Sequence, residues 1–177
     1  MDYESLRKRY KPKQITALFI AESPPAANSN RFFYLEGVTK ADALYLETMK
    51  VLFPEMTSKQ TAKQIRADKA SYLTAFKDKG FYLIDATDTP IAGISKNRKL
   101  SVLAHDGKVL QEKVRVLITV GIPIVLITTT VWKTHYSALR QLGYRVANTI
   151  AIPHPAFGNN RKFGEGLVAV LRLQGLL

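Results

Sequence analysis

The sequence predicts an α/β protein, a three-layer αβα sandwich around a four-stranded, mainly parallel sheet. Short apolar runs alternate along the chain with longer segments of helical periodicity, the order produced by parallel strands joined through helical crossovers. The runs are continuously apolar, as expected of strands covered on both faces. With 177 residues, 46% of them hydrophobic, the chain is long enough to form a single domain, residues 1–177, without disulfide or metal support.

The apolar runs give the positions of the strands. The run 15–21 has no charged side chain, Gly80 precedes the next run, and β-branched residues, which favour strands, dominate the third. Pro153 closes the fourth. The expected strands are therefore residues 15–21, 81–85, 124–129 and 144–152.

The segments between these runs have the pattern of helices. Thr39 is a suitable N-cap for one of them, and Gly80 and Gly143 follow two others at the positions where helices end. Residues 87–99 are expected to form a loop. The expected helices are residues 3–10, a segment after Thr39, and residues 58–79, 109–120, 132–142 and 165–173.

Composition limits the kinds of protein this chain can be. It has no cysteine, which excludes disulfides, thiolate zinc sites and cysteine-bound iron–sulfur clusters and favours a cytoplasmic location. The N-terminus lacks a signal pattern, and no apolar run approaches the length of a membrane span. The formal net charge of +12 favours a polyanionic partner, with nucleic acid, and DNA in particular, as the leading candidate.

Polar loops follow three of the expected strands. Glu22 comes after the first, Asp85 ends the second, and His154 follows the fourth. Because the carboxyl ends of parallel strands meet at one edge of a sheet, where α/β proteins bind ligands, these side chains are expected to share one site.

The order and spacing of these loops resemble the uracil-DNA glycosylase superfamily. The loop Ala21-Glu22-Ser23-Pro24-Pro25 is similar to the Gly-Glu-Ala-Pro-Gly type of first active-site loop in that superfamily, and His154-Pro155-Ala156 is similar to its His-Pro-Ser type loop. Arg31-Phe32-Phe33-Tyr34 stands where the superfamily has an aromatic residue that stacks on the flipped base, and Asp85 stands where it has a base-reading Asn. The chain departs from the superfamily pattern at Ala21, Ser23 and Asp85, which marks it as a divergent member.

The resemblance implies a uracil-DNA glycosylase-like fold and a base-excision repair enzyme without a cofactor or iron–sulfur cluster. Such an enzyme hydrolyses the N-glycosidic bond of a flipped damaged base, uracil or another deaminated base. The reaction needs a carboxylate near the sugar and a hydrogen-bond donor at the departing base, roles that Glu22 and His154 fit. The alternatives are a Glu22 that pairs with a nearby Lys or Arg and a structural His154.

Asp85 is the third catalytic candidate. An ionised Asp only accepts hydrogen bonds, so it disfavours plain uracil recognition. It would accept from an amino group or ring N–H of another damaged base, act as the catalytic carboxylate, or cap the loop that contains Thr87 and Thr89.

The remaining candidates hold the base and the DNA. Phe33 is the preferred stacking residue for the base, with packing beneath the loop as the alternative role of such aromatic side chains. Phe157 is expected to fill the gap left by the flipped base or to anchor its own loop in the core. The substrate-binding candidates are Ser23, Phe32, Phe33 and Tyr34, and the DNA-binding candidates are Pro24, Pro25, Phe157, Asn159, Arg161 and Lys162.

Other chemistry has little support in the sequence. No phosphate-binding glycine loop follows a strand, and His105-Asp106 lacks the further ligands of a metal site, so no metal is expected. Two alternative functions stay open. They are a catalytically silent nucleic-acid-binding member of the same fold and a hydrolase of small nucleosides.

Overall fold

A computed structural model describes residues 2–26, 29 and 31–177. It contains a parallel sheet of three strands, β1 (Ala17–Ala21), β2 (Phe81–Asp85) and β3 (Ile124–Leu126), in the order β2-β1-β3. Ala17 to Ala21 pair with Phe81 to Asp85, and Leu18 pairs with Ile124. Every residue of the three strands is buried, which agrees with the continuously apolar runs and confirms the α/β class.

The predicted fourth strand forms only two isolated bridges, Ile124 with Val146 and Ile127 with Ile152. Between them, the buried Asn148 side chain takes the place of a backbone partner. Its Oδ1 accepts from the Leu126 N–H at 2.9 Å, and its Nδ2 donates to the Leu126 carbonyl at 3.0 Å. The segment therefore runs beside β3, but a side-chain amide interrupts the backbone ladder, and the prediction of a regular strand at 144–152 was wrong.

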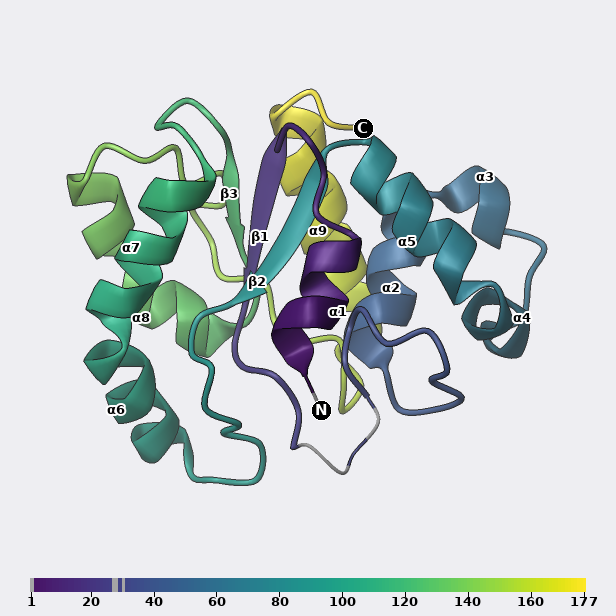
Figure 1. Ribbon diagram of the computed structural model, residues 1–177, viewed down its shortest axis with the longest axis horizontal. Coiled ribbons are helices and arrows are strands. Elements are labelled where there is room, and N and C mark those ends of the chain that lie inside the picture. Colours follow the sequence, from purple (N-terminus) through teal and green to yellow (C-terminus); the bar gives the residue numbers. More distant parts are fainter. Residues whose placement is uncertain (1, 27–28, 30) are drawn as a thin grey trace.

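Helices flank the sheet on both sides (Figure 1). The helices α6, α7 and α8 lie on one side, and α2, α5 and α9 lie on the other, while α1 packs near the edge strand β2. The helix bounds are α1 (Tyr3–Arg9), α2 (Ala43–Leu52), α3 (Pro54–Thr57), α4 (Ala62–Ala67), α5 (Lys69–Asp78), α6 (Lys96–His105), α7 (Gly107–Leu117), α8 (Thr129–Gln141) and α9 (Asn160–Leu173).

Two helix predictions need correction. Residues 96–99, expected at the end of the loop 87–99, instead form the start of α6, and Ser95 caps this helix by accepting a hydrogen bond from the Arg98 N–H. The predicted helix 58–79 is divided into α4 and α5 at Asp68. Helix α4 begins with a capping box, in which Thr61 and Gln64 bond each other reciprocally. None of the helices in the described part of the chain is both long and apolar enough to cross a membrane.

Candidate active site at the carboxyl edge of the sheet

Glu22 follows β1 directly, and its carboxylate is held by two side chains from other elements. Its Oε2 lies 2.7 Å from Nζ of Lys99 on α6. Its Oε1 accepts a hydrogen bond from the hydroxyl of Thr130 in the first turn of α8. The side chain retains 19% of its accessible surface, so the carboxylate is oriented but still reaches solvent. The ion pair with a nearby lysine is one of the roles expected for Glu22 from the sequence.

Thr128 supports this arrangement from a strained backbone conformation. Its φ of 85° and ψ of 145° lie in a region that β-branched residues rarely adopt and that costs about 1–3 kcal/mol. Its hydroxyl accepts from the Val131 N–H at 3.3 Å, which caps α8, and lies 2.9 Å from the Thr130 hydroxyl. The turn after β3 therefore places a hydroxyl directly against Glu22.

Thr130, Thr128 and Lys99 are site residues that the sequence interpretation missed. The signal for the two threonines is the run Thr128-Thr129-Thr130 at the end of the expected strand 124–129, although β3 itself ends at Leu126. Lys99 carries no such signal, because it belongs to the expected loop 87–99 and its approach to Glu22 depends on how α6 packs.

His154 lies in the loop after Ile152 and shares this edge with Glu22. His154 is exposed. Desolvation by the surrounding protein lowers the pKa of His154, and the negative charge of Glu22 acts in the opposite direction. No hydrogen bond or ion pair joins the two predicted catalytic residues within the described part of the chain, although both lie at this edge of the sheet. We call Glu22, Lys99, Thr128, Thr130 and His154 the Glu22 cluster.

Asp85 is bound elsewhere. Its Oδ2 accepts from Nη2 of Arg7 at 2.8 Å, and both side chains are buried. Desolvation raises the pKa of Asp85 to about 6, although the Arg7 charge opposes that shift. No hydrogen bond joins Asp85 to the Glu22 cluster within the described residues. Thr87, rather than Asp85, forms a capping hydrogen bond in the loop after β2. Its hydroxyl accepts from the Thr89 N–H at 3.1 Å.

The three aromatic candidates are core residues. Phe32, Phe33 and Tyr34 are 2%, 5% and 0% exposed. Phe33 packs edge-on against Tyr34 and Tyr45, so it offers no face to a base. Phe33 therefore cannot stack on a base in this structure, because all three rings are buried in the hydrophobic core.

Tyr34 has a definite structural role. Its hydroxyl accepts from the Leu83 N–H at 2.7 Å and donates to the Leu83 carbonyl at 3.1 Å. These backbone groups belong to the edge strand β2, so Tyr34 covers part of the free edge of the sheet.

The residues after Glu22 fasten their loop to neighbouring segments. The Ser23 hydroxyl accepts from the Ile91 N–H at 3.3 Å, and the Pro25 carbonyl accepts from the Tyr3 hydroxyl at 2.5 Å. Pro24 is buried and lines a small cavity of about 380 Å³ next to Tyr3 and Arg7. Ser23, predicted to bind substrate, thus bonds a backbone N–H of the loop after β2.

The loop after His154 presents its aromatic side chain to solvent. Phe157 is completely exposed at a φ of 53°, which contradicts an anchoring role in the core. Asn159 does not cap α9 with its side chain but donates to the Ala156 carbonyl at 3.1 Å. Arg161 and Lys162 are exposed in the first turn of α9 rather than in the loop.

No cluster of three or more His, Asp or Glu side chains that could hold a metal ion occurs among the residues that the structure describes. Comparison of the chain with models of known protein families, with curated proteins and with solved structures finds no significant match. The class defined by the fold and the site is an α/β protein with a carboxylate and a histidine at the carboxyl edge of a parallel sheet.

Proposed function

We propose that the protein is a DNA base-excision glycosylase with a uracil-DNA glycosylase-like fold, which hydrolyses the N-glycosidic bond of a flipped uracil or other deaminated base. The observation that carries this proposal is the orientation of the Glu22 carboxylate by Thr130 and Lys99 at the carboxyl end of β1. Ligands of open parallel sheets bind at this edge.

The chemistry follows from the charges that develop in the reaction. The bond between the sugar C1′ and the base nitrogen breaks with its electron pair passing to the base, and the sugar becomes cationic. Glu22 stabilises that cation and takes a proton from the water whose oxygen bonds to C1′. His154 donates a hydrogen bond to a carbonyl oxygen of the departing base, which carries the negative charge.

Asp85 takes no part in this mechanism, because its carboxylate is bound to Arg7. This removes the residue that the resemblance places at the base edge. The proposal therefore specifies the reaction and leaves the choice among deaminated bases to the experiment.

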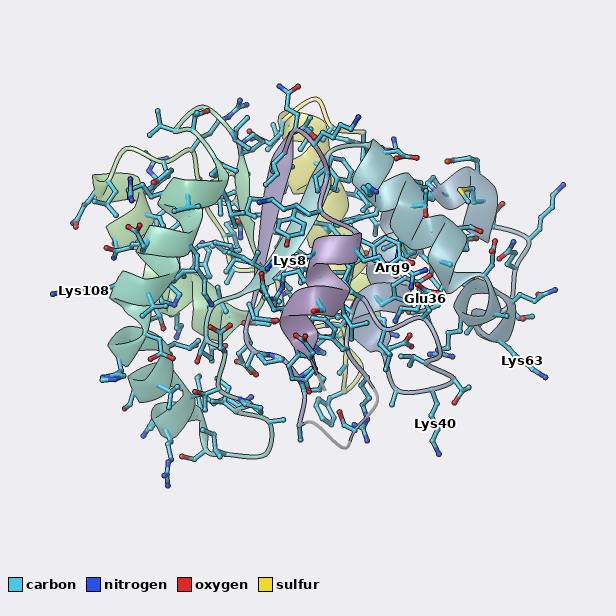
Figure 2. The ribbon with its side chains drawn as sticks, viewed as in Figure 1. Lys8, Arg9, Glu36, Lys40, Lys63 and Lys108 are labelled. Carbon is cyan, nitrogen blue, oxygen red and sulfur yellow. The ribbon has the colours of Figure 1, made fainter. Side chains whose placement is uncertain are left out.

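DNA is the proposed substrate because the chain carries a high positive charge and because Phe157 is exposed near His154. The chain has a formal charge of +12, and Figure 2 shows lysines such as Lys40, Lys63 and Lys108 extending from the body of the molecule. Phe157 is fully exposed on the loop that carries His154, with Arg161 and Lys162 following on α9. An apolar wedge flanked by cations suits a duplex from which a base has been withdrawn.

A catalytically silent nucleic-acid-binding protein is the second candidate. It is favoured by the burial of Phe32, Phe33 and Tyr34, which leaves the predicted stacking residues inside the core. The ion pair of Glu22 with Lys99 also favours this candidate, because a carboxylate bound to a lysine can have a purely structural role.

The test is base release from oligonucleotides that carry uracil, hypoxanthine or xanthine, read as alkali-labile strand breaks. We expect release of at least one base by the unmodified protein and a loss of at least about 100-fold in Glu22→Gln. Glu55→Gln is the matched control, because Glu55 is an exposed acid on α3, and it should retain full activity.

Other outcomes would select the other functions. Salt-sensitive DNA binding without release of any base would identify the silent protein. Turnover of free nucleosides without activity on oligonucleotides would identify a nucleoside hydrolase.

A further inference from the structure

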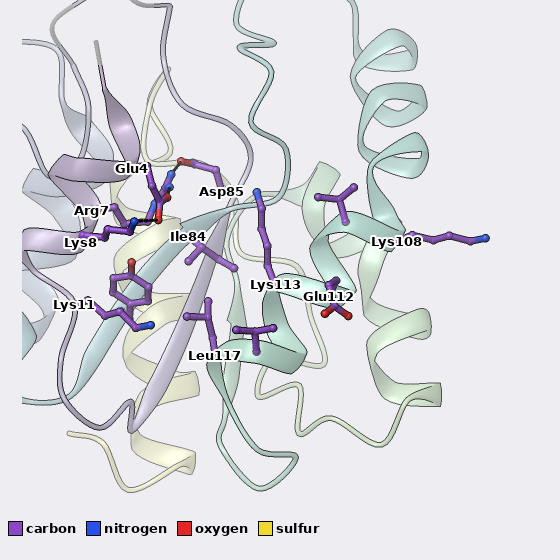
Figure 3. A pocket seen from close by; sticks show the side chains of 13 residues that line it. Glu4, Arg7, Lys8, Lys11, Ile84, Asp85, Lys108, Glu112, Lys113 and Leu117 are labelled. Carbon is purple, nitrogen blue, oxygen red and sulfur yellow. Dashed lines mark hydrogen bonds and ion pairs between the residues drawn. The ribbon is translucent and has the colours of Figure 1, made fainter.

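A groove lies between α1 and α7, separate from the Glu22 cluster. It has a volume of about 650 Å³, within the range of roughly 300–1,000 Å³ that small-molecule sites occupy. Its floor is formed by the edge strand β2, and the side chains of α1 and α7 face each other across that strand (Figure 3). We call it the α1–α7 groove.

The inner surface of the groove is apolar. Tyr82 and Ile84 contribute from β2, and Val116 and Leu117 contribute from α7. Val109 and Val116 are 55% and 68% exposed, so the outer wall presents apolar side chains to water. An apolar surface of this kind on a highly charged chain suits a partner that covers it.

The rim of the groove is basic. Its lining includes five basic and three acidic side chains, and the acids are engaged: Asp85 binds Arg7, Glu4 also binds Arg7, and Glu112 binds Arg115. Lys8 and Lys113 form ion pairs with Glu4 and Asp88. Lys11 has no carboxylate partner among the described residues, whereas Lys108 extends away from the groove (Figure 3). The groove therefore combines an apolar interior with unneutralised positive charge.

One buried donor in the wall of the groove also lacks a partner. Nε of Arg7 is buried and forms no hydrogen bond within the described part of the chain, although its Nη1 and Nη2 bind Glu4 and Asp85. A buried donor without an acceptor is costly.

We propose that the α1–α7 groove binds an amphiphilic anion, with an acyl chain against Tyr82, Ile84 and Leu117 and a carboxylate or phosphate at the basic rim. A nucleotide fits less well, because a base edge and a ribose need several hydrogen-bond partners. The lining contains no Ser, Thr, Asn or Gln, and Arg7 and Asp85 already bind each other. An anionic head group on an acyl chain needs only cationic donors, which the lysines of the lining supply.

The test is isothermal titration calorimetry of the 177-residue protein with dodecanoate below its critical micelle concentration. We expect saturable binding at one site that weakens at least tenfold in Val116→Glu and in Lys11→Glu. Both residues are exposed, so these variants should fold. Val120→Glu and Lys63→Glu are the matched controls, because Val120 and Lys63 are exposed residues outside the groove, and they should bind within twofold of the unmodified protein.

Two further ligands complete the experiment. Tighter binding of lysophosphatidylglycerol than of dodecanoate would identify a phospholipid as the source of the anion, and the reverse order would identify a free fatty acid. The proposal is overturned by the absence of saturable dodecanoate binding, by tighter binding of AMP, or by equal losses in the control variants. None of these outcomes depends on base release, so this site and the proposed glycosylase activity can fail separately.

Discussion

Glu22 illustrates what determines a site at the scale of single residues. Its position directly after a buried strand was visible in the sequence, but its environment depends on Thr130 and Lys99, which come from distant parts of the chain. The strained backbone of Thr128 holds the turn that carries Thr130. The reactivity of the carboxylate is therefore set by neighbours that are far from it in sequence.

Thr130→Val tests this dependence. Valine keeps the shape of threonine but removes the hydroxyl that binds Glu22, and a hydrogen bond to a charged group contributes about 1.5–3 kcal/mol. If Glu22 is the catalytic carboxylate, base release should fall by roughly tenfold or more while the protein stays folded. Thr134→Val on the same helix is the control, since its hydroxyl bonds only the Thr130 carbonyl. Equal rates in the two variants would contradict a positioning role for Thr130.

Asp85 should leave a signature in the pH dependence of stability. Burial raises its folded-state pKa to about 6 from an ordinary value of 3.8, so the folded protein holds this proton more tightly than the unfolded chain. The contribution is fully present below about pH 4 and is lost as the pH rises through 6. With about 1.4 kcal/mol for each pKa unit, the expected loss is of the order of 2–3 kcal/mol.

Urea unfolding of the unmodified protein and of Asp85→Asn between pH 4 and pH 7 measures this effect. The free energy of unfolding of the unmodified protein should decline relative to that of the variant across this range. A constant difference between the two proteins would show that Asp85 does not titrate there.

At the scale of elements, the segment 144–152 shows how one side chain changes a strand. Its apolar composition predicts a strand, and the segment does run beside β3, with bridges at Val146 and Ile152. Asn148 ends the regular pairing because its amide bonds both backbone groups of Leu126. Helix α6 is the opposite case, since its residues 96–99 belong to the expected loop 87–99, whereas capping by Ser95 and packing against α8 make them helical.

Asn148→Ala should destabilise the protein strongly. It leaves the N–H and carbonyl of Leu126 buried without partners, and each unsatisfied group costs about 1–3 kcal/mol. We expect a total loss of roughly 2–4 kcal/mol in the free energy of unfolding, measured with urea. Asn160→Ala is a suitable comparison, because the Asn160 amide is exposed and bonds only the Glu47 side chain, and it should change stability by less than about 0.5 kcal/mol. Similar losses in both variants would contradict the role assigned to Asn148.

At the scale of the whole molecule, the net charge of +12 is the property that favours a nucleic-acid partner. Its sign and size follow from composition, whereas its distribution follows from the fold. Part of the basic charge lies in the first turn of α9, near the exposed Phe157. Another part surrounds the α1–α7 groove, where it serves the second proposed site.

DNA binding should accordingly depend on salt and on Lys162. Each phosphate contact contributes about 0.9 to the slope of log K against log salt concentration. Lys162→Ala should weaken binding for all sequences alike and reduce that slope by about 1, as measured by fluorescence anisotropy of a labelled duplex. Lys59→Ala, in an exposed residue after α3, should leave the slope unchanged. A slope that is the same in all three proteins would exclude Lys162 as a phosphate contact.

By itself, the sequence determined the α/β class, the three strands of the sheet and the placement of Glu22 and His154 at its carboxyl edge. These features follow from continuous apolar runs and from the residues directly after them, which are local properties of the chain. Only the tertiary structure decided that Asp85 pairs with Arg7, that Phe32, Phe33 and Tyr34 belong to the core, and that Lys99 and Thr130 hold Glu22. Those outcomes depend on contacts between residues far apart in sequence, where burial and charge pairing select one partner among many.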